Sequence, residues 1–176
     1  MQWGDGMKKS KQIALCALMT ALALALSYVE RFLPLQLLIP LPGVKLGLAN
    51  IVTLVALYLL KTRHAFVILL LRCFLGAVFG GGISGLLMSL LGGIFALSVM
   101  ALSKRTGLFS LYGVSILGAA FHNVGQILAA SLLMQSVYVA AYLPYLLLVA
   151  LVTGTLTGGA CAGVLKILKN ASISPS

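Results

Sequence analysis

The sequence predicts an all-α integral membrane protein, a bundle of six transmembrane helices, and three observations support this prediction. Of its 176 residues, 61% are hydrophobic and 8% are charged, and the mean hydropathy is +1.15. Soluble domains carry roughly 25% charged residues, so this chain has too few charges to cover a water-facing surface. Its apolar runs are continuous, without the alternation of a membrane β-barrel, and short basic clusters separate them.

A single membrane domain is expected to fill most of the chain. Residues 1–12 form a basic leader, residues 13–169 the membrane domain and residues 170–176 a polar tail. The apolar run after the leader resembles a secretory signal, but apolar sequence continues beyond it, so we interpret it as the first span. The expected spans are residues 13–29, 45–60, 65–79, 83–102, 108–134 and 139–165. Three glycines at 80–82 break the chain between the third and fourth spans, because glycine holds helix poorly.

The basic residues predict how the chain is oriented. Six spans place both termini on one side of the membrane, and most of the Lys and Arg residues fall on that side. They are Lys8, Lys9, Lys11, Lys61, Arg63, Lys104, Arg105, Lys166 and Lys169. The positive-inside rule assigns that side to the cytoplasm. A net charge of +10 also occurs in nucleic-acid-binding proteins, but clusters between apolar runs favour the topological interpretation. We therefore predict a multi-pass plasma-membrane protein with both termini in the cytoplasm.

Arg72 is the most costly residue in the predicted spans. A charge at mid-span costs at least about 2.5 kcal/mol, so Arg72 must face the bundle interior or water. The chain's two acidic residues, Asp5 and Glu30, lie outside the predicted spans. The expected partners of Arg72 are therefore carbonyl groups, neutral polar side chains, water or an anionic ligand. Its alternative role is a structural tie between helices.

A second polar group lies in the fifth predicted span, where His122 and Gln126 share a helix face beside Asn123. Asn50 in the second span falls at a comparable depth. Buried polar groups need partners in lipid, so we expect them to converge on one ligand site in the external half. A loop at 40–45, punctuated by two prolines and a glycine, is expected to close it. The predicted substrate-binding residues are Lys45, Asn50, Arg72, His122, Asn123 and Gln126; Tyr138, Tyr142 and Tyr145 are either further lining residues or an interfacial aromatic belt.

Small residues form a stripe along the first predicted helix. Ala14, Ala17, Ala21 and Ala25 are spaced so that they share one face, which allows another helix to approach closely in lipid. The stripe is either a docking surface for a partner protein or packing within the bundle. The three cysteines lie in apolar runs without metal-ligand spacing, so we expect no metal or cofactor.

Two segments resemble a known family. PGVKLGLANIVTLVALYLL and LLLRCFLGAVFGGGISGLLMSLLGGIFALSVMALSKR are similar to the heptaprenyl diphosphate synthase component I family, also called the Gx transporter family. That family in turn resembles the substrate-binding S components of energy-coupling factor transporters. This resemblance implies six helices, an external loop over the substrate, and first-helix small residues that meet a transmembrane coupling protein working with ATPases.

The resemblance leaves two functions open. The first is a membrane-embedded subunit that binds a small molecule with an anionic or strongly hydrogen-bonding group, for uptake energised by partners. The second is a non-catalytic membrane component associated with heptaprenyl or polyprenyl diphosphate synthesis. Elongating synthases hold magnesium through clustered aspartates, and this chain has one Asp and one Glu. It also lacks an ATP-binding loop. We therefore predict that the chain is not itself an enzyme.

Overall fold

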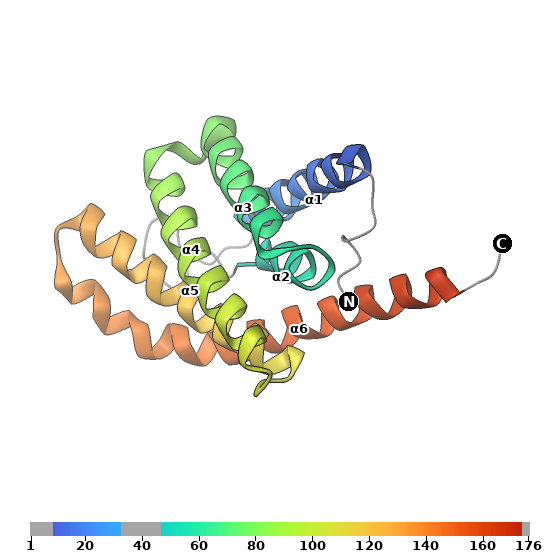
Figure 1. The fold of residues 1–176 in the computed structure, drawn as a ribbon. Helices are drawn as coiled ribbons and strands as arrows, with labels where there is room; N and C mark the ends of the chain where they lie inside the picture. Colours follow the sequence, from blue (N-terminus) through green and yellow to red (C-terminus); the bar gives the residue numbers. More distant parts are fainter. Residues whose placement is uncertain (1–8, 33–46, 174–176) are drawn as a thin grey trace.

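The computed structural model describes residues 9–32 and 47–173, and this part of the chain is helical and contains no strand (Figure 1). The elements in chain order are α1 (Lys9–Val29), η2 (Glu30–Phe32), α2 (Asn50–Leu59), α3 (Thr62–Gly76), η4 (Ala77–Gly81), α4 (Gly82–Thr106), α5 (Leu111–Met134), η5 (Val137–Tyr142) and α6 (Leu143–Ile173). The predicted all-α class is confirmed.

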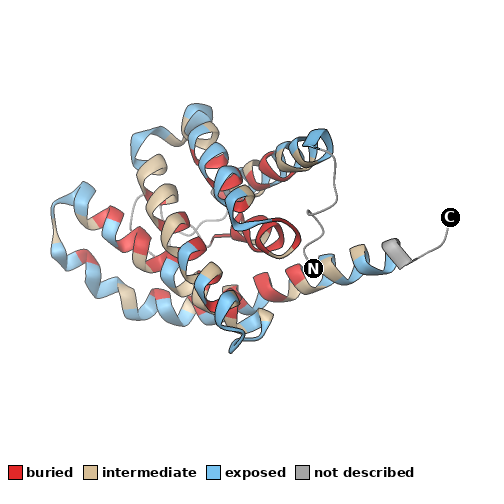
Figure 2. Ribbon diagram, in the orientation of Figure 1, coloured by how far each residue is buried: buried red, intermediate tan, exposed pale blue. Residues whose placement is uncertain are grey.

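The short helix α2 is the centre of the bundle. It has ten residues, about 15 Å of helix, yet it packs against α1, α3, α4, α5 and α6. All of its residues except Ile51 and Tyr58 are buried, which Figure 2 shows as a red segment enclosed by the other helices. A helix that is apolar on every side must be surrounded by protein or by lipid, and here the other helices surround it. α2 therefore forms the core of the bundle.

The prediction of six membrane-spanning helices is not supported. Four helical segments are long and apolar enough to cross a membrane: Lys9–Val29, Thr62–Thr106, Leu111–Met134 and Val137–Asn170. The predicted second span at 45–60 contains only the ten-residue α2 in the described chain, which is too short for a hydrocarbon core of about 30 Å. The sequence could not show this, because burial in protein and burial in lipid select the same apolar residues.

The predicted glycine break between α3 and α4 is confirmed. Gly80 and Gly82 have φ angles of 97° and 61°, which residues with a Cβ rarely adopt. The helical path is interrupted there, and Figure 1 shows the chain turning back so that α4 runs beside α3. α4 then packs along α5, and α5 along α6. The break therefore allows α4 to pack against both α3 and α5.

The outer surface of the bundle is apolar. Large hydrophobic side chains are exposed along α6, for example Leu148, Leu156 and Ile167, each more than 60% exposed. Water-soluble proteins rarely expose contiguous patches of this kind. Together with the four long apolar helices, this surface indicates a membrane protein with its outside facing lipid.

Candidate functional site

Polar side chains meet around the start of α2. The chain enters this helix through Gly47, which has a φ of 82°. The Gly47 carbonyl accepts a 2.8 Å hydrogen bond from the Asn50 N–H, which closes a tight turn. A Cβ at position 47 would lie 2.9 Å from the Asn50 amide nitrogen and 3.3 Å from the His122 ring. A glycine is therefore required for this turn to lie against both side chains.

Asn50 joins this turn to Arg72 on α3. The Asn50 Oδ1 accepts a hydrogen bond of 3.1 Å from Arg72 Nη2, and both side chains are 6% exposed. The expectation that a neutral polar side chain partners Arg72 is therefore confirmed. Among the described residues, Arg72 Nε has no hydrogen-bond partner. The guanidinium group thus has donor capacity that Asn50 does not use.

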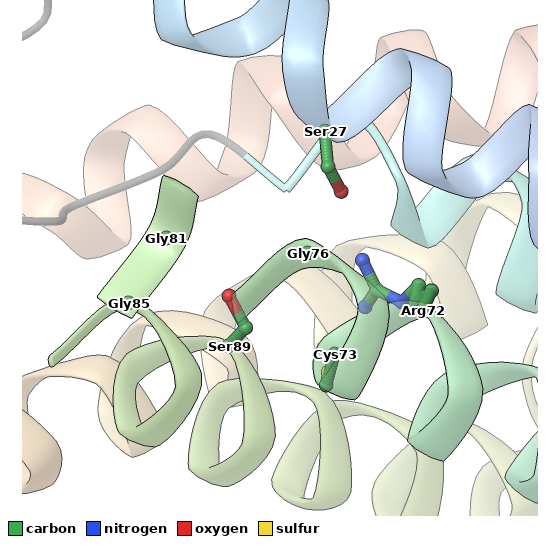
Figure 3. Close-up of a pocket in the computed structure, with 7 residues that line it drawn as sticks. All are labelled: Ser27, Arg72, Cys73, Gly76, Gly81, Gly85 and Ser89. Carbon is green, nitrogen blue, oxygen red and sulfur yellow. The ribbon is translucent and has the colours of Figure 1, made fainter. Parts of the chain in front are cut away.

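A small cavity lies beside Arg72. Figure 3 shows the guanidinium reaching toward a space between Ser27 of α1 and Ser89 of α4, whose hydroxyl groups point into it. Gly76, Gly81 and other residues complete the lining. The cavity volume is about 10 Å³, close to the roughly 10–15 Å³ that one water molecule requires. The lining supplies hydrogen-bonding groups from three helices in this small space.

Glu30 is the residue that the sequence reasoning missed. It begins η2 at the end of α1, is only 2% exposed, and accepts a hydrogen bond of 2.6 Å from the Gly47 N–H. Through Gly47 and Asn50 it is linked to Arg72 by hydrogen bonds. The sequence did not predict this burial, because a residue at the end of a span was treated as lying outside the bundle. The sequence did contain one indication of its importance, because Glu30 is one of only two acidic residues in the chain.

His122 and Gln126 lie on the face of α5 that meets α4 and the start of α2. They are 3% and 0% exposed. A Cβ at Gly92 of α4 would lie 2.9 Å from the His122 ring and 3.1 Å from Gln126 Cγ. The imidazole is therefore held between two glycines, Gly47 on one edge and Gly92 on the other. The predicted shared face of His122 and Gln126 is confirmed, and His122 lies next to Asn50.

Asn123 is directed elsewhere. Its Nδ2 donates a hydrogen bond of 2.7 Å to the backbone carbonyl of Leu146, so its amide joins α5 to α6. Neighbouring positions on a helix point about 100° apart, which separates Asn123 from the His122 face. Ser115 joins the same two helices through a 2.7 Å bond to the Gly154 carbonyl. Asn123 is thus placed as a structural tie rather than among the converging residues.

The remaining predicted residues fall outside this group. Lys45 and the 40–45 loop lie outside the described residues. Tyr138, Tyr142 and Tyr145 are 86%, 37% and 46% exposed, which matches the aromatic-belt interpretation better than a buried lining. The four alanines of the first-helix stripe, Ala14, Ala17, Ala21 and Ala25, are exposed.

A comparison with models of known protein families identifies the family of the chain. A family model described as heptaprenyl diphosphate synthase component I matches residues 19–164, most of the chain. The chain belongs to this family. The resemblance seen in the sequence is thereby confirmed at the family level. A search of curated proteins and a search of solved structures each gave no match.

The component I family name is consistent with a chain that is not itself the catalyst. Within residues 9–32 and 47–173, no group of three or more His, Cys, Asp or Glu side chains is placed to hold a metal ion. The full sequence contains one Asp and one Glu, too few for the aspartate clusters that hold magnesium and diphosphate. The described site of this component I protein offers hydrogen bonds and two buried charged side chains, Glu30 and Arg72.

Proposed function

We propose that this component I protein is a membrane-embedded subunit that binds a small molecule for uptake, energised by partner coupling and ATPase subunits. One observation carries the proposal: Glu30, Asn50, Arg72 and His122 come from four different elements and converge inside an apolar bundle. Burying each of these groups costs roughly 1–3 kcal/mol or more unless it is paired. A purely structural bundle would be more stable with apolar residues at these positions.

The location of the group supports a ligand site. It lies at the start of α2, where Glu30 at the end of α1, Arg72 of α3 and His122 of α5 come together. Gln126 extends the group along α5. In the sequence the predicted 40–45 loop lies between Glu30 and Gly47, which a hydrogen bond joins, and we propose that it closes over the polar group.

The first-helix stripe supports a partner. Ala17, Ala21 and Ala25 are exposed, whereas Met19 and Ala23 of the same helix are buried against the bundle. Beside the stripe, α1, the end of α3 and η4 form an open groove of about 410 Å³, lined among others by Ala21, Gly76 and Phe79. Small residues on a free helix face permit close approach of a second membrane helix. This fits a transmembrane coupling protein.

The second candidate function rests on the family name. Component I of a heptaprenyl diphosphate synthase implies association with a synthase subunit, without catalysis by this chain. The two functions differ in what binds the purified protein: a small molecule at the polar group, or a soluble synthase at its surface.

Mass spectrometry of small molecules that co-purify with the protein tests the first function. The recovered molecule should bind His122→Ala at least about tenfold more weakly, a loss of about 1.4 kcal/mol, because the ring lies within the converging group. Thr157→Ala is the matched control, since Thr157 is buried but bonds only within its own helix. Asn123→Ala should lower stability without weakening binding. Equal affinity in the wild type and the His122 variant would refute the site. Recovery of a synthase subunit without a bound small molecule would favour the second function.

A further inference from the structure

The buried acid Glu30 has a role beyond that of a binding residue. We propose that Glu30 is the internal counter-ion of Arg72 and fastens the start of α2 to the end of α1, so that the described polar group is electrically neutral. It follows, if the proposed function holds, that the site selects a ligand without net charge and recognises it through hydrogen bonds.

Burial makes a counter-ion necessary. Arg72 is 6% exposed and Glu30 is 2% exposed, and apolar helices surround both. A buried charge left without a partner is strongly destabilising, whereas a pair supported by further hydrogen bonds is tolerated. Glu30 is the only Asp or Glu within residues 9–32 and 47–173. No other carboxylate in the described chain can therefore balance Arg72.

The hydrogen bonds place the two charges in one short network. Glu30 Oε1 accepts from the Gly47 N–H at 2.6 Å, Gly47 packs against Asn50, and Asn50 Oδ1 accepts from Arg72 at 3.1 Å. The carboxylate thus reaches the turn that begins α2, where the helix dipole favours negative charge. A single side chain therefore compensates the cation and fixes the position of α2.

This arrangement changes the expected ligand. A site with an uncompensated Arg72 would favour an anion, which was one of the two ligand types expected from the sequence, beside a strongly hydrogen-bonding molecule. With Glu30 in place, an anionic ligand would have to displace the carboxylate or add a buried negative charge beside it. An uncharged ligand needs only hydrogen-bond partners, and Arg72 Nε is a buried donor without a partner among the described residues.

A double-mutant cycle on the detergent-purified full chain tests the counter-ion without any ligand. Glu30→Gln and Arg72→Gln should each lower the melting temperature by about 5–10 °C, since each leaves one buried charge alone. The double variant should lose clearly less than the two single losses combined. Strictly additive losses would overturn the pairing of Glu30 with Arg72.

Chemical rescue tests the charge preference with defined probes. Glu30→Ala leaves room beside Arg72, so sodium acetate should raise its melting temperature by several degrees, with sodium chloride at equal ionic strength as the salt control. Acetate should not rescue Met88→Ala, whose buried side chain packs in an apolar cluster, and neither acetate nor inorganic phosphate should stabilise the wild type. Stabilisation of the wild type by these anions equal to that of Glu30→Ala would overturn the neutral site. Because no substrate is needed, these results stand or fall separately from the proposed uptake function.

Discussion

At the residue scale, glycines decide how closely the polar groups approach. Gly47 and Gly92 contact opposite edges of the His122 ring, and in each case a Cβ would come within 3.3 Å of the ring or nearer. Gly125 likewise allows the backbones of α5 and α4 to approach closely, because a Cβ there would lie 2.6 Å from the Leu91 carbonyl oxygen. The chemistry of the site therefore depends on residues that contribute no functional group.

Gly92→Ala tests this dependence. The new methyl group must displace the His122 ring or the Gln126 side chain, which should cost about 1–3 kcal/mol of stability. Gly163→Ala is the matched control, because its Cβ would meet nothing within 4 Å on α6 and alanine is the better helix former. Thermal unfolding in detergent should show a lower melting temperature for the first variant only. An unchanged melting temperature for Gly92→Ala would show that the site is loosely packed.

At the element scale, α2 depends on contacts from other helices. Its ten residues are too few for a stable isolated helix, which needs roughly 12–15 residues in water even with favourable sequences. Glu30 and Gly47 hold its beginning, and Lys104 of α4 holds its end by donating a 2.6 Å hydrogen bond to the Leu57 carbonyl. The Lys104 ammonium also lies 4.6 Å from the centre of the Tyr58 ring.

Lys104→Met should therefore destabilise the protein by about 1–3 kcal/mol. The change removes a charge-assisted hydrogen bond to a carbonyl in the last turn of α2 and a cation–π contact, while keeping a similar side-chain length. Arg105→Met is the control, since Arg105 is the neighbouring exposed cation of the same helix. The melting temperature in detergent measures the difference. Equal effects of the two substitutions would mean that only overall charge matters.

The α1 stripe gives a second prediction at this scale. Ala17→Phe and Ala21→Phe should abolish co-purification with a co-expressed coupling protein, because a bulky ring prevents close helix approach. Binding of the small molecule should remain, since the polar group lies elsewhere. Leu148→Phe, at an exposed position of α6, should leave the complex intact. Normal recovery of the complex with both alanine variants would leave the stripe as a lipid-facing surface.

At the scale of the whole molecule, the apolar exterior and the basic clusters define an orientation to be tested. Four basic residues lie at the ends of α3 and α4 that are far from the glycine break: Lys61, Arg63, Lys104 and Arg105. The positive-inside rule places these ends in the cytoplasm. The break and the α5–η5 turn would then face outward, as would the polar group near the start of α2.

Cysteine labelling of intact cells tests this orientation. In a background without the three native cysteines, Ser136→Cys should react with a membrane-impermeant reagent, and Thr62→Cys should react only after permeabilisation. Both positions lie at the ends of helical segments in the structure. The reverse pattern would place the termini outside and would remove the basis for an external substrate site.

The sequence by itself determined the membrane class, the helical content and the breaks. Composition alone excludes a water-soluble surface, and the glycines at 80–82 interrupt helix whatever surrounds them. The family could also be recognised from two segments around Asn50 and Arg72. These features depend on the amino-acid composition and on the local conformational preferences of single residues, and both can be read directly from a sequence.

Only the tertiary structure decided which polar residues meet. Asn50, Arg72 and His122 converge as the sequence predicted, whereas the Asn123 amide is directed to α6, because one position along a helix changes the direction of a side chain by about 100°. The structure also brought Glu30 into the bundle and made α2 the enclosed core. Apolar periodicity could not reveal either result, because it does not distinguish protein from lipid as the surroundings of a helix, and the partner of a charge is set by contacts distant in sequence.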